Sequence, residues 1–167
     1  AEPSLKITYV QPKDFTGLLR YVRNILVVTI DPTAYTKVSV GYENNVWARG
    51  QVVVSLKAPN TESIVEYSKT HEKALVDFFV KVEMNRAIEQ LQKEYSMVVM
   101  DNLKSDLNVM LNAPANFTYY KDTTDFFWSS NNANTGRMDL IVYTFPYTDP
   151  NTFTEEYLVA KRDSVLK

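Results

Sequence analysis

The pattern of hydrophobic and polar residues in the first thirty positions predicts two strands around one short helix. Lys6–Val10 alternates and stops at Gln11-Pro12, as a short strand does. Asp14 is a suitable cap for a helix that continues to about Arg23 with one apolar face. Asn24–Ile30 is apolar on both faces, which is typical of a central strand. A helix between two strands favours a parallel pair joined by a right-handed crossover.

The next thirty residues predict two more strands. These are Thr36–Glu43 and Gln51–Lys57, and the second is the more apolar of the two. The polar stretch between them carries Trp47. We expect this stretch to be a loop on the surface, with an indole available for contact.

A long helical region follows. Residues 61–113 contain no Pro and no Gly, but a single helix of that length would span about 80 Å, too long for a domain of this size. We therefore expect a break near Thr70-His71, between helices over Glu62–Lys69 and from Glu72 to about Leu111. A second break within Ser96–Ser105 is left open.

The last third of the chain predicts three strands and a capped helix. The strands are Phe117–Tyr120, Asp125–Ser130 and Met138–Tyr147, and an Asn-rich loop joins the last two. Thr152 and Glu155 have the spacing of a capping box at the start of the final helix. The whole order predicts a single α+β domain over residues 1–167, with a mostly antiparallel sheet and helices packed on one face. A ferredoxin-like variant is one topology that fits it.

The amino-acid composition excludes several kinds of functional site but says less about the fold. The net charge is −2, so the sequence lacks the excess of Lys and Arg that is expected of a nucleic-acid-binding protein. There is no Cys and only one His, which excludes thiolate metal sites, Cys nucleophiles and multi-His sites. The sequence also lacks a phosphate-binding Gly-rich loop and a dinucleotide fingerprint. We expect no cofactor, no metal and no nucleic-acid partner.

Several short blocks, in a shared order over nearly the whole chain, resemble an uncharacterised family of cell-envelope lipoproteins from Bacteroidetes. The clearest blocks are 22–30, 77–86, 125–129, 143–149, 151–154 and 161–165. The resemblance implies that this chain is an internal fragment, about half of a longer secreted lipoprotein whose lipid anchor lies outside it. It further implies a place in the cell envelope, in the periplasm or at the outer membrane, and an envelope protein or glycan as partner. The family has no assigned activity, so it implies no catalytic residues.

Six residues are candidates for a ligand-binding site. Glu83, Asn85 and Arg86 lie together on the predicted long helix, where they could line a polar groove or form only a surface ion pair with contacts to a neighbouring loop. Asp125 and Trp128 lie on one predicted strand, whose exposed face could stack on a sugar or a peptide or could be covered by helices. The sixth candidate is Trp47.

Two hypotheses of function follow. The first is a non-enzymatic binding or scaffold module of the bacterial cell envelope, supported by the aromatic content and the lack of catalytic motifs. The alternative is a carboxylate-dependent hydrolase acting on an envelope or glycan substrate, with Asp125 and Asp139 as a possible pair on neighbouring strands. Thr123 and Ser164 stand in short sequence patterns of bacterial O-glycosylation, so both are candidates for modification.

Overall fold

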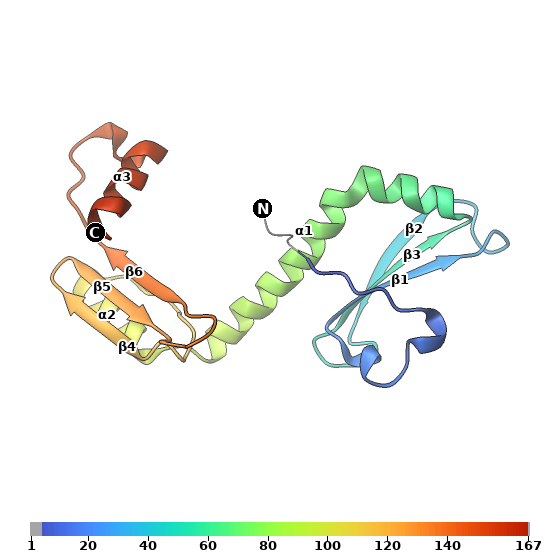
Figure 1. Cartoon of the computed structure of the whole chain (residues 1–167), viewed down its shortest axis with the longest axis horizontal. Helices are drawn as coiled ribbons and strands as arrows, with labels where there is room; N and C mark the ends of the chain where they lie inside the picture. Colours follow the sequence, from blue (N-terminus) through green and yellow to red (C-terminus); the bar gives the residue numbers. More distant parts are fainter. Residues whose placement is uncertain (1–4, 167) are drawn as a thin grey trace. The chain divides into compact units, whose positions relative to one another are not determined.

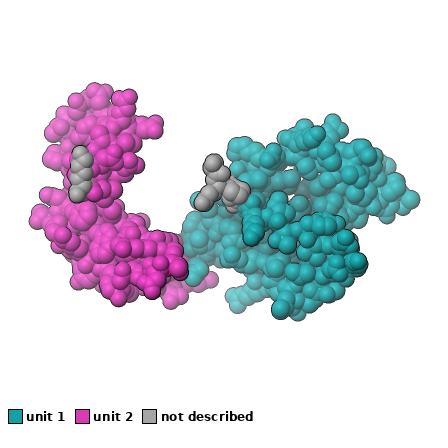
Figure 2. Space-filling model, in the orientation of Figure 1, with its two compact units in different colours: residues 1–90 teal, residues 91–167 magenta. Residues whose placement is uncertain are grey.

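The computed structural model describes residues 5–166, and they form two compact units that divide between residues 90 and 91 (Figures 1 and 2). Each unit contains one three-stranded sheet together with helices. The α+β class predicted from the sequence is therefore confirmed. Where the sequence suggested one domain with one sheet, the structure has two units with a sheet in each.

Unit 1 is built on the sheet β1–β3–β2. The strands are Asn24–Ile30 (β1), Ser39–Asn44 (β2) and Val52–Ala58 (β3), and β3 lies in the middle. β1 is parallel to β3 and β2 is antiparallel to it. The central strand is almost entirely buried because its Val, Leu and Ala side chains have a neighbour on each side.

One face of this sheet lies against the helix α1, Thr61–Lys93. The ring of Tyr42 on β2 lies 5.2 Å from the ring of Phe78 on α1, measured between centroids. Asn24 on β1 donates a hydrogen bond to Glu83 on α1 at 2.6 Å. Leu26 and Val28 share the face of Asn24, since side chains alternate along a strand.

The N-terminal segment differs from the prediction. Lys6–Val10 forms no strand, and the helix expected over 14–23 is replaced by two short 3-10 helices, Pro12–Asp14 (η1) and Gly17–Tyr21 (η2). Gly17 explains the change, because its φ of +53° is left-handed and interrupts a right-handed helix. The parallel partner of β1 is consequently β3, not the N-terminal segment.

The break expected at Thr70-His71 was wrong, since α1 runs through it. The Thr70 hydroxyl donates to the carbonyls of Glu66 and Tyr67, and the His71 ring stacks on Tyr67 with centroids 4.0 Å apart. These contacts stay inside the helix. α1 ends at Lys93, and α2 covers Met97–Leu107. Ser96 caps α2 by accepting from Val99 N–H, and it also donates to the Phe117 carbonyl at 2.6 Å.

Unit 2 is built on the antiparallel sheet β4–β5–β6, formed by Tyr119–Thr123, Phe126–Ser130 and Asp139–Tyr143. Its core lies between one face of the sheet and α2, with Phe127 at the centre. The other residues of the core are Val99, Leu103, Ala113 and Phe117, with Leu107, Leu140 and Val142 at its edge. The chain ends with η3, Pro150–Phe153, and α3, Glu155–Val165.

The capping box predicted at Thr152 and Glu155 was wrong. Thr154 is the N-cap of α3, and its hydroxyl accepts from Tyr157 N–H. Thr152 is buried in η3 and donates to the Asp149 carbonyl at 2.6 Å. Pro150 causes the shift, because it starts a short 3-10 turn that occupies the first residues of the predicted helix.

Candidate functional site

Three of the predicted site residues lie on α1, and one of them, Arg86, joins the helix to the rest of unit 1. Its Nη1 donates to Asn24 Oδ1 at 2.9 Å and to Glu83 Oε1 at 2.6 Å. Its Nε and Nη2 donate to the main-chain carbonyls of Gly50 at 2.9 Å and Arg23 at 3.1 Å. All three nitrogens of the guanidinium are therefore engaged inside unit 1.

Glu83 completes this arrangement. It accepts from Asn24 and Arg86 through Oε1, and its Oε2 lies 3.5 Å from Arg23 Nη1. Only a third of the Glu83 side chain is exposed, and 20% of the Arg86 side chain. Asn85 lies on the exposed side of α1. The structure thus brings Glu83 and Arg86 together as a clamp between helix and sheet and leaves Asn85 out of it.

Trp47 lies in the loop between β2 and β3. Its ring makes an edge-to-face contact with Phe15 at 5.5 Å, and 37% of the residue remains exposed. The buried side chain of Gln51 supports the loop, because it accepts from Trp47 N–H and donates to the carbonyls of Arg20 and Val22. Trp47 is a partly exposed aromatic residue on an organised loop, as predicted.

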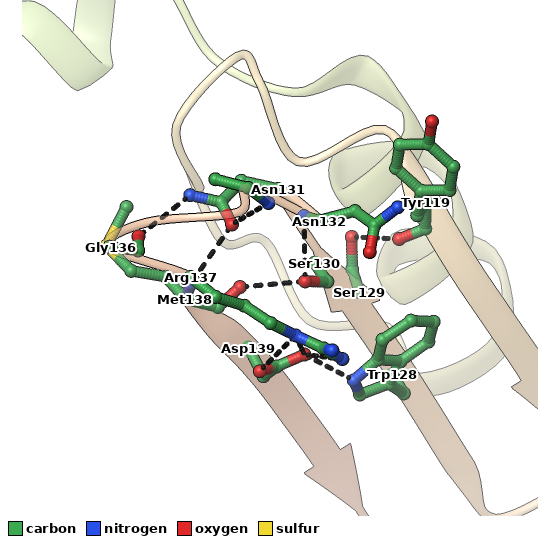
Figure 3. A network of polar contacts seen from close by, with 11 residues as sticks. Tyr119, Trp128, Ser129, Ser130, Asn131, Asn132, Gly136, Arg137, Met138 and Asp139 are labelled. Carbon is green, nitrogen blue, oxygen red and sulfur yellow. Dashed lines mark hydrogen bonds and ion pairs between the residues drawn. The ribbon is translucent and has the colours of Figure 1, made fainter.

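The other two predicted residues belong to unit 2. Trp128 on β5 donates from Nε1 to Asp139 Oδ1 on β6 at 3.0 Å (Figure 3). Arg137 donates two hydrogen bonds to the same carboxylate, from Nε and Nη2, both at 3.0 Å. These contacts, with Arg137 the largest contributor, hold the pKa of Asp139 below its ordinary value. Trp128 is half-buried, and its polar atom is engaged within the sheet.

The loop after β5 is organised by Asn131 and Ser130 (Figure 3). The Asn131 side chain accepts from the N–H groups of Ala133 and Met138 and donates to the Gly136 carbonyl. The buried Ser130 hydroxyl donates to the Met138 carbonyl and accepts from Asn132 N–H. The polar residues here satisfy the backbone of a tight loop, so they form a structural network.

Asp125 and Asp139 do not form a pair. Asp139 lies opposite Ser130 in the register of β5 and β6, whereas Asp125 precedes Phe126 at the other end of β5. Five residues of strand correspond to about 17 Å, and the two carboxyl groups of glycosidases lie about 5 to 9.5 Å apart. Asp125 instead accepts a hydrogen bond from the Thr144 hydroxyl at 3.4 Å.

A different pair of carboxyl groups does meet on unit 2. Asp106 follows the core residues of α2, and Asp122 lies on β4. Hydrogen bonding to Asp106 raises the pKa of Asp122, while the Ser105 hydroxyl and Asp122 lower the pKa of Asp106. Asp106 is exposed and Asp122 is only half-buried, so this pair lacks the dry environment that tunes a catalytic acid.

Two strongly exposed aromatic residues near the C-terminus were not among the site residues predicted from the sequence. Tyr147 and Phe153 stack with centroids 5.4 Å apart, although 64% and 73% of their surfaces are exposed. Nearby, Phe145 lies between the Tyr157 ring at 6.0 Å and the Lys161 ammonium at 5.1 Å. We call Phe145, Tyr147, Phe153 and Tyr157 the C-terminal aromatic surface. The signal that could have found it is Pro146, because a proline interrupts strand pairing, and the strand predicted over 138–147 ends at Tyr143 in the structure.

The described residues contain neither a candidate metal site nor a helix that could cross a membrane. Among residues 5–166, no group of three or more His, Cys, Asp or Glu side chains could hold a metal ion. None of the helices in that range has both the length and the apolar character needed to cross a bilayer.

Comparison with known proteins agrees with the division of the chain. Residues 96–167 are similar to the family described as Domain of unknown function (DUF4837). Searches of curated proteins and of solved structures found no match. Residues 1–92, more than half of the chain, match the family described as Domain of unknown function (DUF8532). The chain therefore belongs to this family, whose molecular function is unknown.

Proposed function

We propose that this protein is a non-enzymatic binding module of the bacterial cell envelope that contacts an envelope protein or glycan through its C-terminal aromatic surface. The exposed, stacked pair of Tyr147 and Phe153 is the observation that carries the proposal. Large aromatic side chains left in water are unfavourable unless a partner covers them, and rings of this kind are common anchors of binding surfaces.

The arrangement of this surface also suits recognition. Thr154 caps α3 and Asp149 caps η3, so two short helices fix the backbone on both sides of Phe153. Lys161 over Phe145 places a positive charge beside the rings. The stacked pair of Tyr147 and Phe153 can stack on a sugar ring or on an apolar side chain, and the Lys161 ammonium over Phe145 can pair with an acidic group of the partner.

The contacts and positions of the other candidate residues support binding over catalysis. Arg86 and Glu83 join α1 to the sheet of unit 1, and Asp125 and Asp139 lie at opposite ends of the β5–β6 pair. The location in the envelope, and a lipid anchor outside this chain, follow from the resemblance to Bacteroidetes lipoproteins. They are part of the proposal.

The test is affinity capture from the native envelope with the full-length protein as bait. The variant carries Tyr147→Ser and Phe153→Ser, and the matched control carries Tyr9→Ser and Tyr21→Ser, which remove two exposed tyrosines of unit 1. If each ring contributes about 0.5–1.5 kcal/mol, the double variant should retain its partner about tenfold less well. A partner held equally by wild type and both variants, or no retained partner, would refute the proposed surface.

A further inference from the structure

β1 is an edge strand without the features that usually protect an edge. Its seven residues, Asn24–Ile30, contain no charge, no Pro and no Gly. The edge strand on the other side of the sheet, β2, carries both Gly41 and Glu43. Natural edge strands commonly use charges, Pro or bulges to prevent pairing with another chain. An edge without them is open to strand addition.

The backbone of β1 has hydrogen-bonding groups to offer on its outer side. Val52 N–H donates to the Arg23 carbonyl at 2.9 Å, and Asp31 N–H donates to the Ala58 carbonyl at 3.0 Å. Because the groups of a strand alternate, the odd-numbered residues between these bonds face β3. The N–H and C=O groups of Asn24, Leu26, Val28 and Ile30 therefore point away from the sheet. No other described segment forms a backbone hydrogen bond with them.

The side chains of the same residues are also uncovered. Leu26, Val28 and Ile30 are 44%, 47% and 47% exposed, although they lie on the sheet face against which α1 packs. The equivalent residues of the central strand, Val54, Leu56 and Ala58, are buried. A strand added beside β1 would extend this apolar face and cover the three side chains.

We propose that β1 pairs with β1 of a second copy of this chain, antiparallel and about a two-fold axis at Val27. In this register Leu26 faces Val28 of the partner and Asn24 faces Ile30, so all seven residues pair and no charge meets another. The outward-facing residues then exchange about eight backbone hydrogen bonds. The two sheets join into one, and the α1 helices lie on the same face and enclose Leu26, Val28 and Ile30.

Two properties of the chain favour a second copy over an unrelated strand. The strand is self-complementary in this register, as an isologous interface requires. In this register Leu26 meets Val28 and Val27 meets Val27 across the axis, and such apolar pairs stabilise antiparallel strands. This inference concerns unit 1 and does not depend on the binding surface proposed on unit 2.

Cysteine crosslinking tests the register, because the natural chain contains no Cys. Residues at the two-fold axis face each other with Cα atoms about 4.5 Å apart, within reach of a disulfide. Under mild oxidation Val27→Cys should form a covalent dimer. Thr29→Cys is the matched control: it lies on the same sheet face and is more exposed, but it faces Ile25 of the partner. Equal crosslinking of the two variants, or none at Val27→Cys, would overturn the proposal.

Sedimentation of the full chain tests the association itself. Wild type should form dimers, and Leu26→Lys with Val28→Lys should raise the dissociation constant at least roughly tenfold, because lysines then face lysines. Leu26→Lys with Val28→Glu should restore the dimer, since opposite charges then meet. Val40→Lys on β2 is the control and should leave the dimer unchanged, with the fold of each variant checked by circular dichroism. A monomeric wild type, or a dimer that survives the double lysine variant, would contradict the inference.

Discussion

Replacing Arg86 with Ala should destabilise unit 1, because its guanidinium joins α1 to the rest of the unit. The substitution removes four hydrogen bonds, three of which join α1 to β1 or to the segments beside it. Hydrogen bonds to charged groups contribute about 1.5–3 kcal/mol each, but partial exposure lets water replace part of that. We expect a loss of about 2–4 kcal/mol. Ala and Arg have similar helix propensities, so the loss reports tertiary contacts.

The measurement is urea unfolding followed by the fluorescence of Trp47, in a Trp128→Phe background so that only unit 1 is observed. Asn85→Ala is the matched control, because it changes the neighbouring exposed residue and should shift stability by no more than about 0.5 kcal/mol. Arg86→Lys keeps the charge but loses the planar set of donors, so it should not restore stability fully. If Arg86→Ala costs no more than Asn85→Ala, the clamp is not a stabilising element.

Two further predictions concern unit 2. Asp122→Asn should raise the urea midpoint of unfolding at pH 7. The pKa of Asp122 is raised in the folded state, so the folded protein loses stability as the pH rises through that pKa. The amide has no charge to place beside Asp106 and avoids this loss. The gain should vanish below the ordinary aspartate pKa of 3.8, and a gain that persists there would contradict the assignment. Thr154→Ala should speed hydrogen exchange in α3 about fivefold, for a cap worth about 1 kcal/mol. Glu155→Ala should have a smaller effect, and the reverse order would favour the capping box.

The strands were the most predictable part of the fold. β3 and β5 were placed within a residue of their observed bounds, because each is a short run of β-branched or aromatic residues between turn signals. The prediction of an N-terminal helix was wrong for a local reason. An apolar stripe at helical spacing was present, but Gly17 adopts a left-handed conformation in the middle of it.

The helical region shows where sequence periodicity stops being informative. Apolar residues occur around much of α1, including Leu75, Val76, Phe78 and Phe79, so no single stripe marks its ends or its buried side. The separation of α1 from α2 depends on Ser96. Its hydroxyl caps α2 and donates to the Phe117 carbonyl 21 residues away. A contact that is so distant in sequence leaves no local pattern.

The contact between Glu83 and Arg86 was predictable from the sequence, but its role was not, and the C-terminal aromatic surface was not predicted. The spacing of Glu83 and Arg86 indicated a pair on one helix face, and the pair exists at 2.6 Å. The partners that make it a clamp are the carbonyls of Gly50 and Arg23, and any residue type offers a carbonyl there. The identity of such partners depends on how the chain folds back, so the sequence alone could not separate a ligand site from a structural joint.

The sequence pattern of β1 disagrees with the position of this strand in the monomer. Asn24–Ile30 has the composition of a central strand, apolar on both faces and free of charge, yet the chain places it at an edge and puts β3 in the centre. Exposed apolar side chains at an edge favour aggregation unless a specific partner covers them. Pairing with a second β1 removes the disagreement, because it makes β1 a central strand of a six-stranded sheet. The composition of β1 is then explained by the assembly and not by the monomer, and the Val27→Cys crosslink decides between the two.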